Sequence, residues 1–159
     1  MSHLIVSRIV LTLSMMCAVG APARAEEQPA TLDEAVKQVG ALIEEFKGTR
    51  SGTKTVISKE GVMTVTQMQG GTLFEETQVP LKDLDLSTII ARTDIRSDAS
   101  RVFMSTVDGK KSVQSKLTGP VEKWYYTCGK GPEGLANAKK LATALKRAAE
   151  LAGAKAAAK

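Results

Sequence analysis

Apolar residues recur at three- and four-residue steps between residues 35 and 46, which is the spacing of one face of an α-helix. Thr31 and Glu34 stand at the spacing of a capping box, in which two side chains satisfy backbone N–H groups of the first turn. Lys47 followed by Gly48 matches the preferences of a helix C-terminus. The pattern therefore predicts a helix over about residues 31–47, with an apolar stripe formed by Ala35, Val36, Val39, Leu42, Ile43 and Phe46.

From residue 49 to residue 128 the pattern changes to short runs rich in threonine and valine, separated by glycine, proline and charged residues. The turns Lys59-Glu60-Gly61 and Gly70-Gly71 indicate antiparallel hairpins. Asp108-Gly109 readily takes the positive φ angles of a type I′ turn, and it predicts a third hairpin between its flanking runs. The predicted strands cover residues 53–58, 62–68, 72–79, 87–94, 101–107, 110–117 and 121–128.

Two details of these strands bear on binding. Residues 64–66 and 112–116 show little apolar alternation, so we expect a sheet edge there that accepts a partner strand. In the last strand Trp124, Tyr126 and Cys128 share one face, and Lys123 and Tyr125 lie on the other. We expect Trp124 and Tyr126 to pack in the core. An exposed Tyr125 beside Lys123 would suit a partner protein or a glycan ring.

Gly131-Pro132-Glu133 opens a final helix, with proline at its favoured first position. Its apolar positions are Leu135, Ala138, Leu141, Ala142, Leu145, Ala148, Ala149 and Ala152. Four cations lie mostly off that face, namely Lys139, Lys140, Lys146 and Arg147. The alanine- and lysine-rich residues 154–159 either continue the helix or fray.

The elements together predict an α+β protein: an N-terminal helix, about seven antiparallel strands and a C-terminal amphipathic helix. We divide the chain into an N-terminal helical segment (26–48), a single α+β domain (49–153) and a tail (154–159). The order of elements from Thr53 to Gly153 resembles the pleckstrin-homology-like superfold, although the basic inositol-phosphate pattern of the first hairpin is missing. The resemblance implies a barrel or curved sheet, with a core closed at one end by Leu135, Leu141 and Leu145, and it implies no ligand. A plain sheet with both helices on one face is the alternative.

Residues 1–25 have the three parts of a cleavable export signal. Arg8 supplies a positive charge, residues 9–20 form an uncharged apolar run, and Ala23-Arg24-Ala25 places small residues where signal peptidase needs them. That run is too short to cross a membrane, which takes roughly 20 apolar residues. The mature chain is thus expected to begin at Glu26, in the periplasm or outside the cell. An uncleaved anchor is the alternative, and acylation of Cys17 is disfavoured because the preceding Met16 is not small.

Charge narrows the expected partners. The formal net charge is +5, and removal of Arg8 and Arg24 with the signal leaves 20 Lys and Arg against 17 Asp and Glu, a net +3. Residues 129–159 hold seven of these cations and two acids, so the excess lies on the last element. A nucleic-acid partner is not expected, because it requires a larger basic face, interleaved aromatics and another compartment. Binding of the basic helix to anionic membrane is an alternative, against which stands its alanine-rich apolar side.

The mature sequence lacks histidine, since His3 lies in the signal, and it contains the single cysteine Cys128. The commonest general base and transition-metal ligand are therefore missing, and we expect no catalytic residues, no metal site and no cofactor. Cys128 is expected either to be buried on a strand or to pair with another chain. Four acidic groupings are expected to be solvated: Glu44-Glu45, Glu75-Glu76, Asp83 with Asp85, and Asp94 with Asp98.

These observations favour a non-enzymatic, exported binding module whose partner is an unknown protein or small ligand of the cell envelope. Two surfaces are candidates for its binding patch. One is Tyr125 with Lys123, and the other is the basic side of the last helix, with Lys139, Lys140, Lys146 and Arg147.

Overall fold

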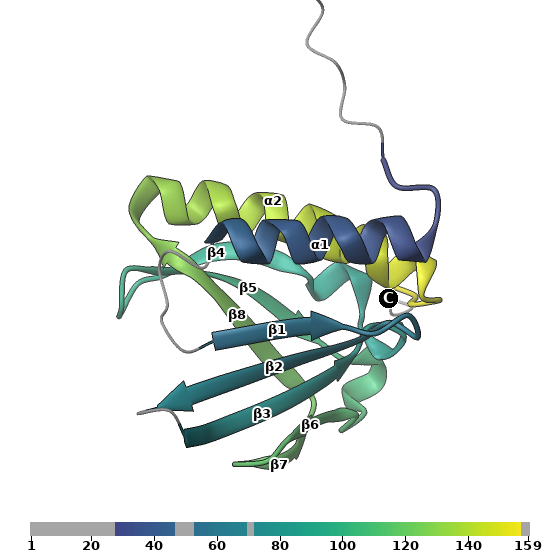
Figure 1. Ribbon diagram of the computed structural model, residues 1–159, viewed down its shortest axis with the longest axis horizontal. Coiled ribbons are helices and arrows are strands. Elements are labelled where there is room, and N and C mark those ends of the chain that lie inside the picture. The colour runs from purple at the N-terminus through teal and green to yellow at the C-terminus, as the bar shows by residue number, and fades with distance from the viewer. Residues whose placement is uncertain (1–27, 47–52, 70–71, 157–159) are drawn as a thin grey trace, which may run out of the picture.

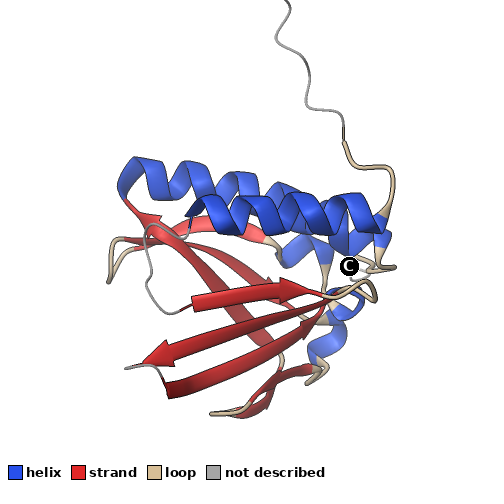
Figure 2. Ribbon diagram, viewed as in Figure 1, coloured by secondary structure: helices blue, strands red, loops and turns tan. Residues whose placement is uncertain are grey.

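The computed structural model describes residues 28–46, 53–69 and 72–156. Two α-helices lie together along one side of the molecule, and the strands form the rest of it (Figures 1 and 2). The strands make two antiparallel sheets, one in the order β1-β2-β3-β6-β7 and the other in the order β4-β5-β8. The predicted α+β class is confirmed, and the described residues form eight strands in two curved sheets that do not close into a barrel.

The helices and strands are α1 (Leu32–Phe46), β1 (Thr53–Ile57), β2 (Val62–Gln69), β3 (Thr72–Pro80), β4 (Ile90–Asp94), β5 (Ala99–Ser105), β6 (Val113–Ser115), β7 (Gly119–Val121), β8 (Lys123–Lys130) and α2 (Gly131–Leu151). Short 3₁₀ turns are η2 (Leu81–Asp83), η3 (Leu86–Thr88) and η4 (Val107–Gly109). The predicted signal with Ala23, Ala25 and Glu26, the helix end at Lys47-Gly48 and the turn Gly70-Gly71 lie outside the described residues.

The N-terminus of α1 has the predicted capping box. The backbone N–H of Glu34 donates to Thr31 Oγ1 over 3.3 Å, and Glu34 Oε2 accepts from the N–H groups of Ala30 and Thr31 at 2.9 and 3.2 Å. The N–H of Ala30, followed by that of Thr31, holds the pKa of Glu34 below its usual value. The predicted helix is therefore confirmed, and its buried stripe consists of Ala35, Val39, Ile43 and Phe46.

Strands β1, β2 and β3 form an antiparallel meander. Gly61, in the turn between β1 and β2, has φ of +74°, which glycine adopts without steric cost. The pairing of β2 with β3 runs from Val62 opposite Pro80 to Gln69 opposite Thr72, which confirms the predicted hairpin. The inner face of this sheet carries the buried side chains of Met63, Val65 and Val79.

The predicted edge strands are not edges. Residues 64–66 belong to β2, which pairs with both β1 and β3, and residues 113–115 form β6, which pairs with β3 and β7. The expectation of a partner strand at these two places is wrong. The polar residues of β2 mark its outer face instead, because Thr64 and Thr66 alternate with the buried Met63 and Val65.

The segment around Asp108-Gly109 is not a hairpin, although both residues have the predicted positive φ angles. Asp108 and Gly109 have φ of 54° and 67°, yet the strand before them lies in one sheet and the strand after them in the other. Thr106 holds this crossover, because its Oγ1 donates to Lys110 O at 2.5 Å and its N–H donates to Glu122 O at 2.9 Å. The predicted hairpin is thus wrong, since the turn dihedrals do not decide which strands pair.

Helix α2 packs against α1 and against β4, β5 and β8. Leu141 and Leu145 are fully buried there, while Leu135 is only half-buried. The helix ends in a Schellman motif at Gly153, in which the N–H groups of Gly153 and Ala154 donate to Glu150 O and Ala149 O. Beyond it the chain neither continues the helix nor frays at once, because the N–H of Leu86 donates to Lys155 O at 3.3 Å.

One hydrophobic core joins both sheets and both helices, and α1 contributes to it together with β2, β5 and α2. Trp124 and Tyr126 pack against this core, as expected, with their ring centroids 6.2 Å apart. Cys128 is fully buried within it, which confirms the first of the two expectations for this thiol. Among the described residues, no helix combines the length and apolar character needed to cross a membrane.

Candidate functional site

The outer face of the sheet β4-β5-β8 presents aromatic and basic side chains next to one another. Its inner face is occupied by α2 and the core, where Val102, Met104 and Cys128 are buried. Because strand side chains alternate between faces, the intervening residues point away from α2. We call these outward residues the aromatic–arginine face, and they are Ile90, Arg92, Arg101, Phe103, Lys123 and Tyr125.

Strand register arranges this face into two neighbouring rows. In the first row Ile90 lies opposite Phe103, which lies opposite Tyr125. Ile90 and Tyr125 leave 42% and 46% of their surface in solvent, so this apolar row is exposed at both ends. In the second row Arg92 lies opposite Arg101, which lies opposite Thr127. An apolar row and an arginine row therefore run side by side across the three strands.

The two rows are linked by stacking. The Arg92 guanidinium carbon lies 4.1 Å from the centre of the Phe103 ring, and that of Arg101 lies 4.4 Å from the centre of the Tyr125 ring. The two rings also contact each other, with centroids 5.9 Å apart and planes tilted by 44°. A guanidinium uses its flat face in such a contact, and its N–H donors, which lie in the plane, stay available for carboxylate or phosphate oxygens.

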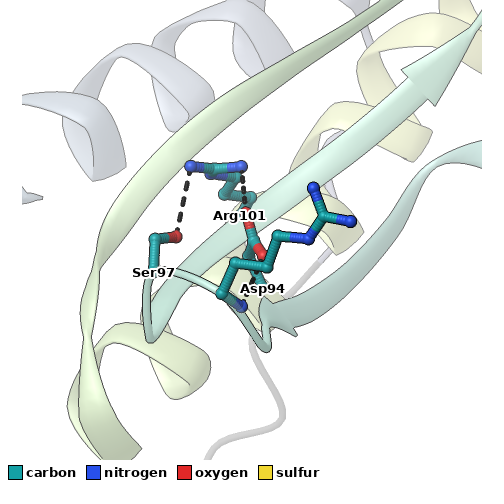
Figure 3. Close-up of polar contacts among 4 residues, drawn as sticks. Asp94, Ser97 and Arg101 are labelled. Carbon is teal, nitrogen blue, oxygen red and sulfur yellow. Dashed lines mark hydrogen bonds and ion pairs between the residues drawn. The ribbon is translucent and has the colours of Figure 1, made fainter.

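Arg101 is held in place by the turn between β4 and β5 (Figure 3). Its Nη1 lies 2.5 Å from Asp94 Oδ2, and its Nη2 donates to Ser97 Oγ over 3.3 Å. The other Asp94 oxygen accepts from the backbone N–H of Arg96 at 3.0 Å. That N–H, with the Ser97 hydroxyl and the Arg101 charge, holds the pKa of Asp94 below its usual 3.8.

This network predicts a dependence of stability on pH. A carboxyl whose pKa is lowered by folding stabilises the native state above its unfolded pKa, near 3.9, and loses that contribution as the pH falls further. We therefore expect the stability difference between the native chain and Asp94→Asn to be constant near neutral pH and to shrink below about pH 4. Urea unfolding at a series of pH values measures it, and a difference that stays constant into the acid range would contradict the assigned role.

Arg92 and Arg101 differ in how far their charges are neutralised. Arg101 is paired with Asp94, whereas Arg92 is exposed and forms no ion pair within the described part of the chain. At the other end of the face, Lys123 lies 3.4 Å from Glu122 and is largely exposed. The row of arginines also contains two buried polar atoms that have no hydrogen-bond partner among the described residues, Arg101 Nε and Thr127 Oγ1. Arg92 is thus the cation of this face whose charge is least compensated.

The basic residues predicted on the last helix lie elsewhere. Lys140, Lys146 and Arg147 line an open groove of about 730 Å³ between α1 and α2, and Lys139 is exposed outside it. Within the groove Arg147 is already engaged, since its Nε donates to Pro29 O at 2.9 Å and its Nη1 lies 3.4 Å from Glu150. Because α2 covers the inner face of β4-β5-β8, these cations and the pair Lys123 and Tyr125 do not form one patch.

Of the acidic groupings expected in solvent, Glu44, Glu45 and Asp98 are exposed, whereas Glu75 and Asp85 are used structurally. Glu75 accepts hydrogen bonds from Ser115 Oγ and Thr77 Oγ1 at 2.9 and 3.3 Å. Asp85 was expected in solvent but is buried, which is a correction; its Oδ1 accepts from both the N–H and the hydroxyl of Ser87 and so satisfies the start of η3. In the described ranges no three His, Cys, Asp or Glu residues come together as a possible metal site.

The strand pattern indicated Tyr125 and Lys123, but it did not indicate Arg92, Arg101 or Phe103. These three lie on β4 and β5, and only the pairing of β5 with both β4 and β8 brings them beside Tyr125. A local signal did exist, because Arg101 and Phe103 are two residues apart and so share a face of a strand. Comparisons with protein-family models, with curated proteins and with solved structures found no match for this chain.

Proposed function

We propose that this chain is a non-enzymatic binding module of the cell envelope, and that it binds its partner through the aromatic–arginine face. One observation carries the proposal: Ile90, Phe103 and Tyr125 form a partly exposed apolar row directly beside Arg92 and Arg101. Tyrosine and arginine are enriched among the residues that dominate binding energy at interfaces. Exposed apolar side chains that gather on one surface beside polar residues are typical of interaction sites.

Two further features support a binding role rather than catalysis. The mature sequence contains no histidine, so the usual general base is missing from it. The carboxylates closest to hydroxyl groups, Glu75 and Asp85, are hydrogen-bonded to Ser115 and Ser87 within the fold. These acids stabilise the strand β6 and the turn η3.

The envelope location rests on the N-terminal sequence. Residues 1–25 combine a positive start, an uncharged apolar run and the small residues Ala23 and Ala25 before Glu26. We propose that signal peptidase cleaves after Ala25 and releases the remainder on the far side of the membrane. An exported chain with one buried cysteine needs no disulfide for its stability, because a chain of this size buries enough surface on folding.

Attachment to anionic membrane through α2 is the alternative, and the packing of α2 weakens it. The apolar side of α2 is already buried, with Leu141, Leu145 and Ala148 in the core. An amphipathic helix binds a membrane by inserting its apolar face, which here is not free to insert. Lys139 and Lys140 remain exposed, so only a weaker electrostatic attraction is left to this alternative.

Photo-crosslinking in the native organism tests the proposal. We expect p-benzoylphenylalanine in place of Tyr125 to give a discrete adduct in the envelope fraction, because that ring is exposed at one end of the apolar row of the proposed interface. Adding Arg92→Ala should reduce the adduct about tenfold, as for loss of one interface arginine. N-terminal sequencing of the adduct should begin at Glu26.

The matched control places the same photoreactive residue at Lys139, which is exposed on α2, the helix that covers the other face of the sheet. This position should give no comparable adduct. An adduct with lipid from position 139, with none from position 125, would support the membrane alternative instead. Equal adduct yields from positions 125 and 139, unchanged by Arg92→Ala, would show that the aromatic–arginine face is not the binding surface.

A further inference from the structure

We infer that the partner of the aromatic–arginine face is a protein whose docking surface places carboxylates beside apolar side chains. This inference rests on the proposed function and adds the chemistry of the partner. It makes Arg92 the anchor for a partner carboxylate, with Ile90 and Tyr125 receiving the neighbouring apolar groups.

The charge of the face calls for an acidic partner. Three cations point outward from the sheet, Arg92, Arg101 and Lys123, and two of them are paired, Arg101 with Asp94 and Lys123 with Glu122. Asp94 is engaged by Arg101, so it does not offset Arg92. A surface that meets this face therefore gains by presenting negative charge, which speeds encounter and excludes basic partners.

The guanidinium groups are held in position before binding. Stacking on Phe103 at 4.1 Å restricts the Arg92 side chain, and the hydrogen bonds that Arg101 donates to Asp94 and Ser97 restrict Arg101. A long side chain loses conformational entropy when it is ordered at an interface, and a side chain that is already ordered avoids most of that cost. The fork of N–H donors on Arg92 can then donate two parallel hydrogen bonds to a carboxylate.

The shape of the face favours a macromolecule. Small ligands bind in concave sites, and the cavities found beside α1 and α2 are lined by none of the six residues of the aromatic–arginine face. The face spans three hydrogen-bonded strands, so contact there involves side chains rather than addition of a strand. A protein surface that presents side chains to these three strands meets these conditions.

The stacking contacts favour a protein over a glycan or a single-stranded nucleic acid. Both of those ligands bind aromatic side chains by lying on an open ring face. Here one face of Phe103 is covered by Arg92 and one face of Tyr125 by Arg101, and the two rings are tilted against each other. Aliphatic side chains can instead pack on the exposed parts of Ile90 and Tyr125.

Selection from a random peptide display library tests the inference with the purified protein as bait. Peptides that bind the native chain are counter-selected against the double variant Arg92→Ala/Tyr125→Ala. We expect the enriched peptides to place Asp or Glu next to leucine, isoleucine or an aromatic residue. Their binding should weaken several-fold between about 0.1 and about 1 M NaCl, because the Debye length falls from about 10 to about 3 Å.

Single variants then assign the anchor. Arg92→Ala should lower the affinity for the selected peptides about tenfold or more. The affinity of Arg92→Lys should lie between those of the native chain and Arg92→Ala, because lysine keeps the charge but not the planar fork. Lys139→Ala on α2 should change the affinity less than about twofold, because that residue is outside the interface. Circular dichroism spectra and urea midpoints that match the native chain would show that the variants remain folded.

The outcomes separate this inference from the proposed function. Enrichment of neutral or basic peptides whose binding still requires Arg92 and Tyr125 would contradict the inference that the partner is acidic. It would still support the aromatic–arginine face as the binding surface. The bound peptides can also be displaced by polygalacturonate, by an oligonucleotide or by free peptide. If polygalacturonate or the oligonucleotide displaces them at a lower concentration than free peptide does, the face belongs to another class of ligand. No enrichment over the double variant would overturn both proposals.

Discussion

Leu145→Ala is expected to destabilise the fold by about 2–5 kcal/mol, the range for truncating a fully buried leucine. Leu145 has no exposed surface and lies on α2 in the core that joins both sheets and α1. The substitution removes apolar contacts and leaves a cavity that the surrounding elements can only partly fill. Urea-induced unfolding followed by circular dichroism measures the loss as a lower midpoint with little change in slope.

Leu135 provides the matched control on the same helix. It was expected to close the core with Leu141 and Leu145, but it is only half-buried near the start of α2. Leu135→Ala removes the same atoms from a site that water already reaches in part, so its cost should be clearly smaller. Equal losses for the two substitutions would contradict the packing described for α2.

Gly134→Ala is expected to destabilise the protein by about 1–3 kcal/mol, although alanine is the better helix former by about 1 kcal/mol. A Cβ at Gly134 would lie 2.6 Å from the carbonyl carbon and 3.0 Å from the carbonyl oxygen of Gly129. Those atoms are backbone at the end of β8, so they cannot rotate away as a side chain would. The start of α2 would have to move away from the sheet. Thermal or urea unfolding measures the resulting loss of stability as a lower midpoint.

Gly40 in α1 is the control for Gly134, because the two are glycines inside helices with opposite surroundings. A Cβ at Gly40 meets nothing within 4 Å. Gly40→Ala should therefore stabilise the protein by about 0.5–1 kcal/mol through reduced backbone entropy of the unfolded chain. Stabilisation by both substitutions would show that α2 does not approach β8 as closely as described.

Features that depend on neighbouring residues could be predicted from the sequence. The capping box of Thr31 and Glu34, the turn at Gly61 and the start of α2 at Pro132 each involve groups within a few positions of one another. The alternation along β8 likewise placed Trp124 inside and Tyr125 outside. Local sterics and hydrogen bonding decide such features before any tertiary contact forms.

Pairing between distant strands could not be predicted in the same way. Asp108-Gly109 has the expected positive φ angles, yet the chain changes sheets there, and β5 pairs with β8 rather than with β6. The polarity of residues 64–66 suggested an edge, but β2 has a neighbour on each side. A strand's own residues report which face is buried and say little about which strand lies beside it.

The sequence by itself determined the helices, the approximate strands, the faces of β8 and the N-terminal pattern on which the export proposal rests. Only the tertiary structure decided that Arg92, Phe103 and Tyr125 meet on one surface, and that the cations of α2 do not join them. The reason is physical: dihedral preferences and alternation act over a few residues, whereas the register of β4, β5 and β8 is set by burial of their inner faces against α2.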